Sequence, residues 1–163
     1  PTEETNAAKA LIAEGCDVIA QHCDTPNPQL EAESANVWGV GYNSDMIKDA
    51  PGATLTSVEW HWGAYYTQAV QQVIDGTWNC ENYFGGMADG LLDISDLNSA
   101  LCTDEMQAKV DEARNEILNN GFNVFDGVLE TNDGSTVGEE GSTLDDATIK
   151  GGINWYYKNV EVK

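Results

Sequence analysis

Polar and aromatic side chains recur just after three short apolar segments of the sequence, where they could together bind a small molecule. The set combines imidazole, carboxylate, amide and indole groups: His22, Asp24, Asn43, Asp45, Trp60 and Trp62. Carboxylate and amide groups can form hydrogen bonds with a polar ligand, and indole rings can stack on a planar one. The combination predicts a polar pocket with aromatic walls.

Each of these residues also has a purely structural explanation. Asp24 is well placed to cap the helix that follows it, and Asn43 and Asp45 are typical of a turn. Trp60 and Trp62 could pack in a core or an interface. For each residue considered alone, the structural explanation is favoured. Their recurrence after three successive segments favours a common binding site.

The segments that precede these side chains have the pattern of short strands. Residues 16–20 form an apolar run without alternation, as expected for a strand buried on both faces, and 37–42 and 54–60 are further apolar strands. A helical pattern at 4–14 precedes the first strand, and another at 26–35 separates the first two. This alternation predicts an α/β fold, a parallel sheet with helices on both faces. Ligands of such sheets bind outside the carboxyl ends of the strands, where the candidate residues fall.

The rest of the sequence predicts a single α/β unit over 1–163, since no linker or internal repeat divides it. The further elements are helices at 64–74 and 103–120, a strand at 122–129, an exposed hairpin or loop at 131–142, a helical turn at 145–150 and a closing strand at 153–162. The helix at 103–120 has the clearest apolar stripe: Met106, Val110, Ala113 and Ile117.

The charge of the chain excludes whole classes of partner. Its 163 residues include 28 Asp and Glu but only 7 Lys and Arg, which gives a net charge of −21. Nucleic acids and anionic lipid surfaces are polyanions, so we expect neither as a partner. No apolar run approaches the roughly 20 residues that span a bilayer. The sequence begins at Pro1 without Met, and we interpret it as a processed or truncated product.

Motifs for cofactors, metals and catalysis are missing or incomplete. Gly39-Val-Gly41 follows a strand but lacks the third glycine of a dinucleotide site. The acidic stretches 89–96 and 132–140 do not place ligands as a calcium loop does, and His22 and His61 are too isolated for zinc. We therefore expect no cofactor and no metal. A pair of catalytic carboxylates remains a less favoured alternative.

The four cysteines are too few for a disulfide scaffold, and none lies in a Cys-x-x-Cys pair. Cys16 and Cys23 flank an apolar run and are interpreted as buried thiols. Cys80 and Cys102 could pair in an oxidising compartment, but free thiols are favoured for all four.

Ordered motifs along nearly the whole chain resemble one protein family. They are Glu14-Gly-Cys-Asp-Val-Ile-Ala-Gln-His-Cys-Asp-Thr-Pro26, Val40-Gly-Tyr-Asn-Ser-Asp-Met46, the segment from Ala50 to Tyr66, Gly76-Thr-Trp78, Gly85-Gly86, Phe122-Asn-Val-Phe-Asp-Gly127 and Asn154-Trp-Tyr-Tyr157. These motifs resemble the second half of the basic membrane lipoprotein (BMP) family, also called Med or PnrA-like. Its members are substrate-binding components of ABC-type transporters.

The resemblance implies the second lobe of a type I periplasmic-binding fold, in which two α/β lobes clasp a ligand between them. Residues 1–60 would form the core of this C-terminal lobe, 61–80 would cross to the other lobe, and 81–163 would form a closing segment. The resemblance also implies an ABC transporter permease as partner, a lipid anchor on an N-terminal region outside this sequence, and a location in the periplasm or at the cell surface.

The resemblance further implies a purine ligand, because characterised relatives bind purine nucleosides and the most similar subgroup is associated with purine bases. Asp45 matches a strand-end Asp that forms a hydrogen bond with the ligand in the family. Trp60 stands where nucleoside-binding members have a Lys, and His22 and Asp24 replace a Gly-rich turn. Both departures suit a flatter ligand than a nucleoside, since an indole offers stacking in place of a point charge.

The sequence as a whole thus predicts the ligand-binding lobe of an extracytoplasmic lipoprotein that delivers a purine base or nucleoside to an ABC importer. We expect hinge closure around the ligand and no enzymatic step. Two alternatives remain open: a ligand-responsive signalling receptor on the same fold and, less favoured, a carbohydrate-active hydrolase domain.

Overall fold

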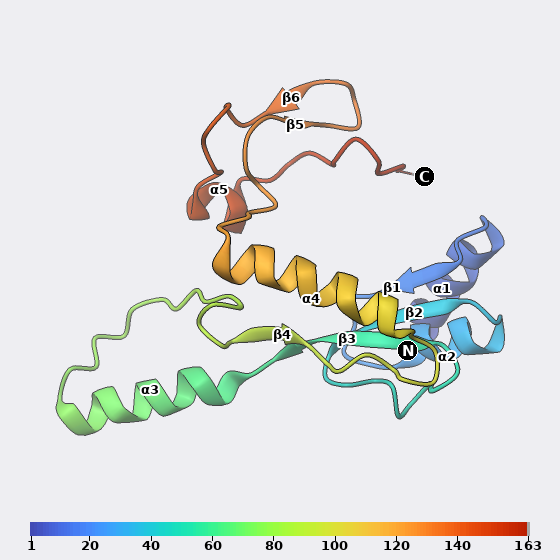
Figure 1. Cartoon of the computed structure of the whole chain (residues 1–163), viewed down its shortest axis with the longest axis horizontal. Helices are drawn as coiled ribbons and strands as arrows, with labels where there is room; N and C mark the ends of the chain where they lie inside the picture. The colour runs from blue at the N-terminus through green and yellow to red at the C-terminus, as the bar shows by residue number, and fades with distance from the viewer. Residues whose placement is uncertain (163) are drawn as a thin grey trace. The chain divides into compact units, whose positions relative to one another are not determined.

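The computed structural model describes residues 1–162, which group into two compact units, one from Pro1 to Val110 and one that begins at Asp111. Figure 1 labels the elements along the chain. The first unit contains α1 (Thr2–Ala13), β1 (Val18–Ala20), α2 (Asn27–Ser34), β2 (Trp38–Asn43), β3 (Thr54–Trp60), α3 (Trp62–Asp75) and β4 (Leu92–Ile94). Helix α4 (Asp104–Asn119) begins in the first unit and continues into the second, which contains β5 (Leu129–Glu130), β6 (Thr136–Val137) and α5 (Asp146–Gly151).

The sheet of the first unit confirms the α/β class. Its order is β1-β2-β3-β4, and the pairs β1–β2 and β2–β3 are parallel. Strand β4 differs, since it runs antiparallel to β3 and pairs Leu92 with Trp60. The chain leaves the sheet after β3 and returns beside the point of departure, where the amide of His61 donates to the carbonyl oxygen of Leu91 at 2.7 Å. The carboxyl ends of β1, β2 and β3 therefore share one edge of the sheet.

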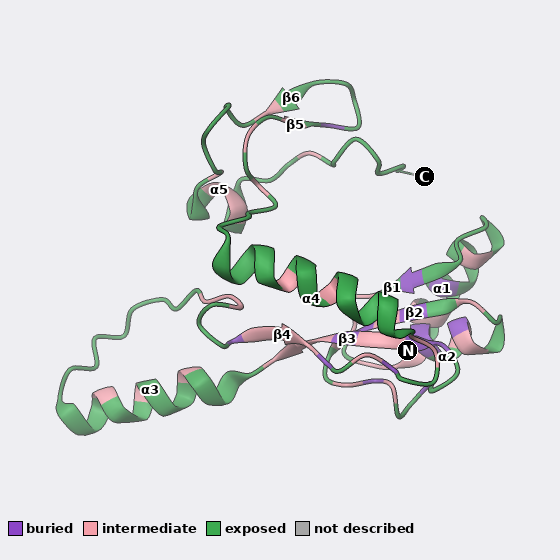
Figure 2. Cartoon of the chain, in the orientation of Figure 1, coloured by how far each residue is buried: buried purple, intermediate pink, exposed green. Residues whose placement is uncertain are grey.

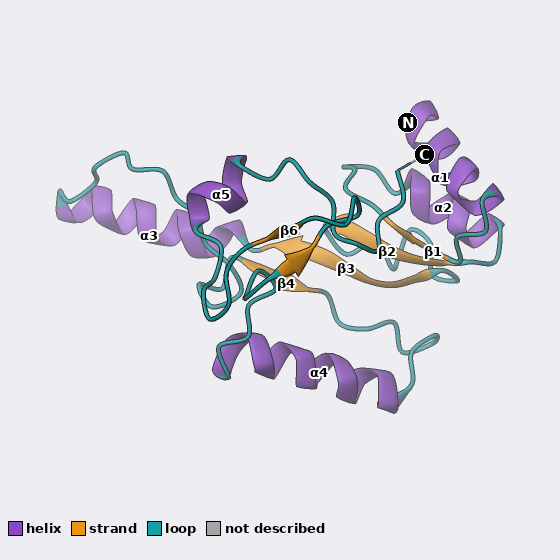
Figure 3. Ribbon diagram, turned by 90° about the horizontal axis from the view of Figure 1, so that it is seen from above, coloured by secondary structure: helices purple, strands orange, loops and turns teal. Residues whose placement is uncertain are grey.

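Small side chains let two helices approach the sheet closely. Helices α1 and α2 pack on each other and on the β1–β2 part of the sheet (Figure 3). The buried core between them is Ala8, Ile19, Ala32 and Ala53 (Figure 2). Gly39 of β2 allows α2 to approach the sheet, since a Cβ there would lie 3.1 Å from Nε2 of Gln29. Gly41 makes room on β2 for a side chain of β3, since a Cβ there would collide with the Ser57 hydroxyl.

Strand β1 corrects the prediction of a strand buried on both faces. Ile19 points toward the helices and is 2% exposed, whereas Val18 is 44% exposed. The strand also begins two residues later than predicted, so Cys16 lies in the turn after α1 and is exposed, and Cys23 is only partly buried. The interpretation of these two cysteines as buried thiols was wrong. All four cysteines are free thiols.

The second unit confirms the predicted hairpin, since β5 and β6 pair in antiparallel fashion around the Asn132-Asp133-Gly134 turn. Its other predicted strands were wrong. Most of the segment 122–129 lies outside any strand: only Leu129 belongs to β5, and Asp126 forms an isolated bridge with Thr143. The chain turns here because the side chain of Asn123 accepts from the amide of Phe125 at 3.0 Å and Gly127 has a φ of 72°. Residues 153–162 contribute an isolated bridge, between Thr131 and Tyr157, in place of a strand.

Helices of the remaining segments follow the predictions closely. Helix α4 covers the predicted helix at 103–120, although none of its residues is buried. The helical turn at 145–150 is α5, and its N-terminus is capped by Asp145, whose Oδ1 accepts from the amide of Thr148 at 2.8 Å. Within residues 1–162, no helix is long and apolar enough to cross a membrane.

Candidate functional site

The six predicted site residues lie at or just beyond the carboxyl ends of the three parallel strands. His22 and Asp24 follow β1, Asn43 is the last residue of β2, and Trp60 is the last residue of β3. Asp45 lies in the turn after β2, and Trp62 is the first residue of α3. Because β1, β2 and β3 are neighbours in the sheet, these residues share the same edge.

Hydrogen bonds hold the loop that carries His22 and Asp24. The side chain of Gln21 accepts from the amide of Cys23 at 2.7 Å and donates to the carbonyl oxygen of Thr25 at 3.1 Å. The hydroxyl of Thr25 in turn donates to Oε2 of Glu4 in α1 at 2.5 Å. Hydrogen bonds from Thr25 and Asn27 lower the pKa of the Glu4 carboxyl. The loop after β1 is therefore tied both to itself and to α1.

Asp24 does not cap α2. The N-cap residue of that helix is Pro26, which makes no side-chain capping hydrogen bond. The carboxylate of Asp24 instead accepts from Nδ2 of Asn43 at 3.3 Å, across the ends of two adjacent strands. Asn43 has a φ of 74°, a left-handed conformation that asparagine tolerates better than most residues. Both side chains are exposed, so their remaining polar atoms can reach a ligand.

Asp45 has a structural role that uses one of its two carboxylate oxygens. Oδ1 accepts from the amide of Ile47 at 2.9 Å, which closes the turn after β2. The next residue, Met46, is 2% exposed, and its amide donates to the Ser57 hydroxyl of β3 at 3.0 Å. The turn is thus anchored to the sheet, and the half-buried Asp45 is held at a defined position beside it.

Aromatic rings from the three strand ends contact one another in series. The ring centroids of His22 and Tyr42 are 4.4 Å apart, and those of Tyr42 and Trp60 are 6.5 Å apart with the rings perpendicular. Trp60 and Trp62 stack at 5.4 Å, and Trp62 stacks on Tyr66 of α3 at 6.2 Å. The sequence alone did not single out Tyr42. Its place directly before Asn43 at the end of β2 was the available signal.

An acidic and an imidazole side chain lie beside this series of rings. Nε2 of His61 is 3.4 Å from Oε2 of Glu59, so the two form an ion pair when His61 is protonated. Carboxylates at the three strand ends, on Asp24, Asp45 and Glu59, give this edge hydrogen-bond acceptors. No group of three or more His, Cys, Asp or Glu side chains within residues 1–162 is placed to hold a metal ion.

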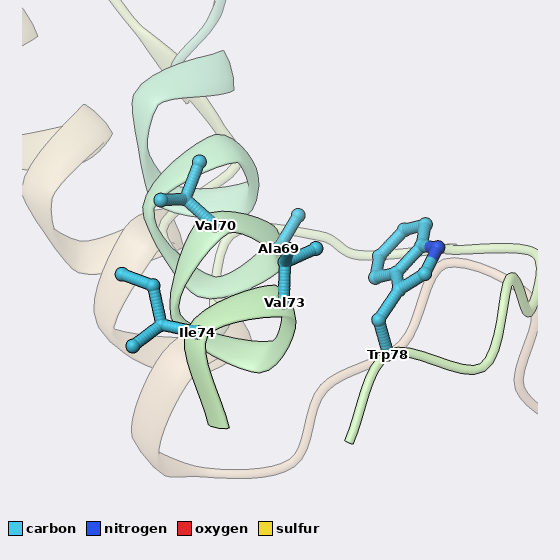
Figure 4. Close-up of a pocket in the computed structure, with 5 residues that line it drawn as sticks. All are labelled: Ala69, Val70, Val73, Ile74 and Trp78. Carbon is cyan, nitrogen blue, oxygen red and sulfur yellow. The ribbon is translucent and has the colours of Figure 1, made fainter. Parts of the chain in front are cut away.

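Helix α3 extends the aromatic series into an uncovered apolar face. The helix confirms the prediction at 64–74, and Gly76 ends it with a φ of 71°. None of its residues is buried. Figure 4 shows an apolar hollow on this helix, lined by Ala69, Val70, Val73, Ile74 and Trp78. Val73 is 62% exposed and Ile74 is 72% exposed, which is unusual for neighbouring apolar residues of one helix.

Comparison with known families identifies the family of this chain. Residues 1–126 match the family described as "ABC transporter substrate-binding protein PnrA-like". The chain belongs to this family. Proteins of the PnrA-like class bind small-molecule ligands outside the cytoplasm and work with a membrane permease.

Two curated relatives differ in the ligand that their names give. A purine-binding protein of Brucella abortus is 36% identical over 163 residues, which is all of this chain and 46% of the relative. A protein of Haloferax volcanii, provisionally named as an ABC transporter glucose-binding protein, is 33% identical over 127 residues, or 78% of this chain and 32% of the relative. The chain thus spans less than half the length of either relative.

Solved structures confirm the fold. A transcriptional activator of the comK gene from Bacillus halodurans matches with a TM-score of 0.59 at 19% identity, over 72% of this chain and 42% of that one. A solute-binding protein of an ABC transporter from Conexibacter woesei matches with a TM-score of 0.53 at 16% identity, over 74% of this chain and 41% of that one. At these identities the likeness concerns the fold alone.

Proposed function

We propose that this chain is the C-terminal lobe of a substrate-binding lipoprotein that delivers a purine base or nucleoside to an ABC importer. One observation carries the proposal: carboxylates and aromatic rings converge at the carboxyl ends of β1, β2 and β3 in a chain that is 36% identical to a purine-binding protein. Open α/β sheets bind their ligands at this edge. The proposed role involves binding and release, with no chemical step.

The proposed ligand contacts divide into acceptors and rings. Asp45 offers its second oxygen to an N–H group of the base, since its first oxygen is used by the turn. Asp24 offers an acceptor that Asn43 orients. Trp60 stacks on the base with the face that Trp62 does not cover, and His22 borders the site on the β1 side. A purine base presents a flat face for the rings and polar N–H groups at its edge for the carboxylates.

The uncovered face of α3 supports a second lobe as the missing wall of the site. Residues 61–80 would cross to that lobe, and the hollow at Val70, Val73 and Ile74 would pack on it. The occupant we propose is the other half of the same protein, because relatives of this chain are more than twice its length. The ligand would then bridge two lobes and stabilise their closed arrangement, which the permease would recognise. A lipid anchor on the other half would attach the protein to a membrane, either in the periplasm or at the cell surface.

Isothermal titration calorimetry on the two-lobe protein, with adenine, adenosine, guanosine, hypoxanthine and glucose, tests the proposal. We expect a purine to bind and glucose to give no heat. Glucose is included because one relative is provisionally named for it, and a hexose can also stack its C–H face on indole rings. Binding of glucose with no binding of any purine would overturn the proposed ligand class.

A further inference from the structure

We infer that Tyr42 contacts the ligand, as the middle member of a series of three rings, His22, Tyr42 and Trp60, in which Trp60 stacks on the flat face of a heteroaromatic base and Tyr42, perpendicular to Trp60, contacts the edge of that base. The inference deepens the proposed function and rests on it. It adds a residue that the motif comparison does not assign, and it narrows the ligand to one with an aromatic face.

The register of the sheet places these three rings at one level. Strand β1 pairs Ala20 with Val40 of β2, and His22 and Tyr42 each lie two residues beyond that pair. Strand β2 pairs Tyr42 with Val58 of β3, and Trp60 lies two residues beyond Val58. Side chains two residues apart on a strand point to the same face. Tyr42 and Trp60 therefore extend from one face of the sheet, and the 4.4 Å between the ring centroids of His22 and Tyr42 places His22, which follows the end of β1, beside them.

Tyr42 contacts both of the other rings. Its centroid is 4.4 Å from that of His22, with the rings inclined at 48°, and 6.5 Å from that of Trp60, with the rings at 87°. One face of Trp60 is already stacked on Trp62 at 18°. Trp60 thus has one face left for stacking, and Tyr42 is the aromatic group that contacts Trp60 from the neighbouring strand β2.

The polar groups around the series match the edge of a base. Asn43 follows Tyr42 directly and donates to Asp24, so an oriented carboxylate lies beside the His22 end of the series. Asp45 lies three residues beyond Tyr42, in the turn that the Ser57 hydroxyl anchors. Trp60 on the flat face, Tyr42 at the edge and carboxylates nearby would bind a planar ligand that carries N–H donors at its edge.

A purely structural role for Tyr42 makes different predictions from a contact role. In the structural case, removing the ring would loosen the end of β2 and lower the melting temperature. Affinity would then fall only as far as stability does. In the contact case, affinity falls while the melting temperature stays near that of a matched control.

The chain offers that control on the same strand. Trp38 lies four residues before Tyr42, on the same face of β2 but at the opposite end, and is 43% exposed. Trp38→Leu removes a larger ring far from the proposed ligand. It should leave adenine affinity unchanged, whatever it does to stability.

The experiment measures adenine affinity and melting temperature for the two-lobe protein and for Tyr42→Leu, Tyr42→Phe and Trp38→Leu. We expect Tyr42→Leu to weaken adenine at least tenfold with a melting temperature no lower than that of Trp38→Leu. Tyr42→Phe should stay within threefold of the wild type, because the ring is the contact. Intermolecular nuclear Overhauser effects between the adenine C–H protons and the Tyr42 ring should be present in the wild type.

Three results would overturn the inference while leaving the proposed function intact: adenine affinity unchanged in Tyr42→Leu, equal losses in Tyr42→Leu and Tyr42→Phe, or equal losses in Tyr42→Leu and Trp38→Leu. A wild-type protein that binds no purine at all would overturn the proposed function and the inference with it.

Discussion

Replacing Asp45 with asparagine should weaken purine binding while leaving the fold intact. The two oxygens of the carboxylate have separate tasks. Oδ1 accepts from the amide of Ile47 at 2.9 Å, and the amide oxygen of an asparagine can accept the same bond. The second oxygen, which we propose as the ligand acceptor, becomes an NH₂ group. The substitution thus keeps the turn and reverses the hydrogen-bonding capacity at one atom.

The expected loss follows from the kind of bond that is removed. A hydrogen bond to a charged group contributes about 1.5–3 kcal/mol. This free energy corresponds to an affinity roughly 10- to 150-fold weaker. Stability should change little, because Met46 remains buried and its amide still donates to the Ser57 hydroxyl at 3.0 Å. Asp45→Ala removes both functions and should lower the melting temperature as well as the affinity.

Calorimetry with adenine and thermal melts on the two-lobe protein measure both quantities. Asp49→Asn is the matched control, since it makes the same change of charge at an exposed residue four positions further along the chain. It should leave affinity unchanged. If Asp45→Asn binds adenine as tightly as the wild type but melts many degrees lower, Asp45 is a turn residue and the proposed site is misplaced.

Three further predictions concern the ligand class, the second lobe and pH. Trp60→Lys should shift the preference from adenine toward adenosine, since it removes a stacking ring and adds a donor for a ribose hydroxyl; an unchanged ratio in competition binding would refute a ligand contact by Trp60. The chain 1–163 alone should bind adenine at least about tenfold more weakly than the two-lobe protein, because one lobe supplies part of the burial that a ligand site needs; equal calorimetric affinities would refute this. Hydrogen bonds from Thr25 and Asn27 lower the pKa of the Glu4 carboxyl below its ordinary 4.5. The ionised carboxylate therefore stabilises the fold above pH 4.5, and this stabilisation is lost as the pH falls through the lowered pKa. Thermal melts should show Glu4→Gln less stable than the wild type at pH 7, with the difference vanishing in acid.

The elements that position the site could be predicted because each has a local cause. Apolar runs ending at Ala20, Tyr42 and Trp60 marked the three parallel strands within one or two residues. Gly76 ended α3 as expected, in the left-handed conformation that glycine adopts readily. The strand-end location of the polar residues then followed from the general geometry of parallel sheets.

The predictions that failed concerned segments whose structure depends on more than local propensity. In one segment, side chains compete with a neighbouring strand for the backbone amides, and in the other a strand would need a partner from elsewhere in the chain. Residues 122–129 are β-prone, but the side chains of Asn123 and Asp126 capture backbone amides and form turns instead. Residues 153–162 are rich in aromatic residues, yet only the bridge at Tyr157 forms, because a strand needs a partner of matching length and β5 has only two residues. Composition records the propensity for a strand but not the available partner.

Tyr42 shows what the register adds to a list of candidate residues. In the sequence it is one more aromatic residue in an apolar run, and such residues mostly pack in cores. Only the pairing of Ala20 with Val40 and of Tyr42 with Val58 places its ring level with His22 and beside Trp60. Strand alternation could have assigned it to the same face as Val40, but the face alone does not identify its neighbours.

Asp24 and Asp45 show how the structure separates two residues that look alike in the sequence. Each follows a predicted strand, and each had a local structural explanation, one as a helix cap and one as a turn residue. Asp24 is free of the cap and instead links two strand ends through Asn43 at 3.3 Å, whereas Asp45 does close its turn. Because Asp24 caps no helix and its side chain is exposed, its carboxylate keeps acceptor capacity that we propose for the ligand. Asp45 combines both roles, and its turn bond fixes the direction in which its second oxygen can meet a ligand. The two carboxylates should therefore respond differently to substitution. Replacing Asp24 should lower ligand affinity alone. Replacing Asp45 should lower affinity and should also lower stability unless the new side chain keeps an oxygen that accepts from the amide of Ile47.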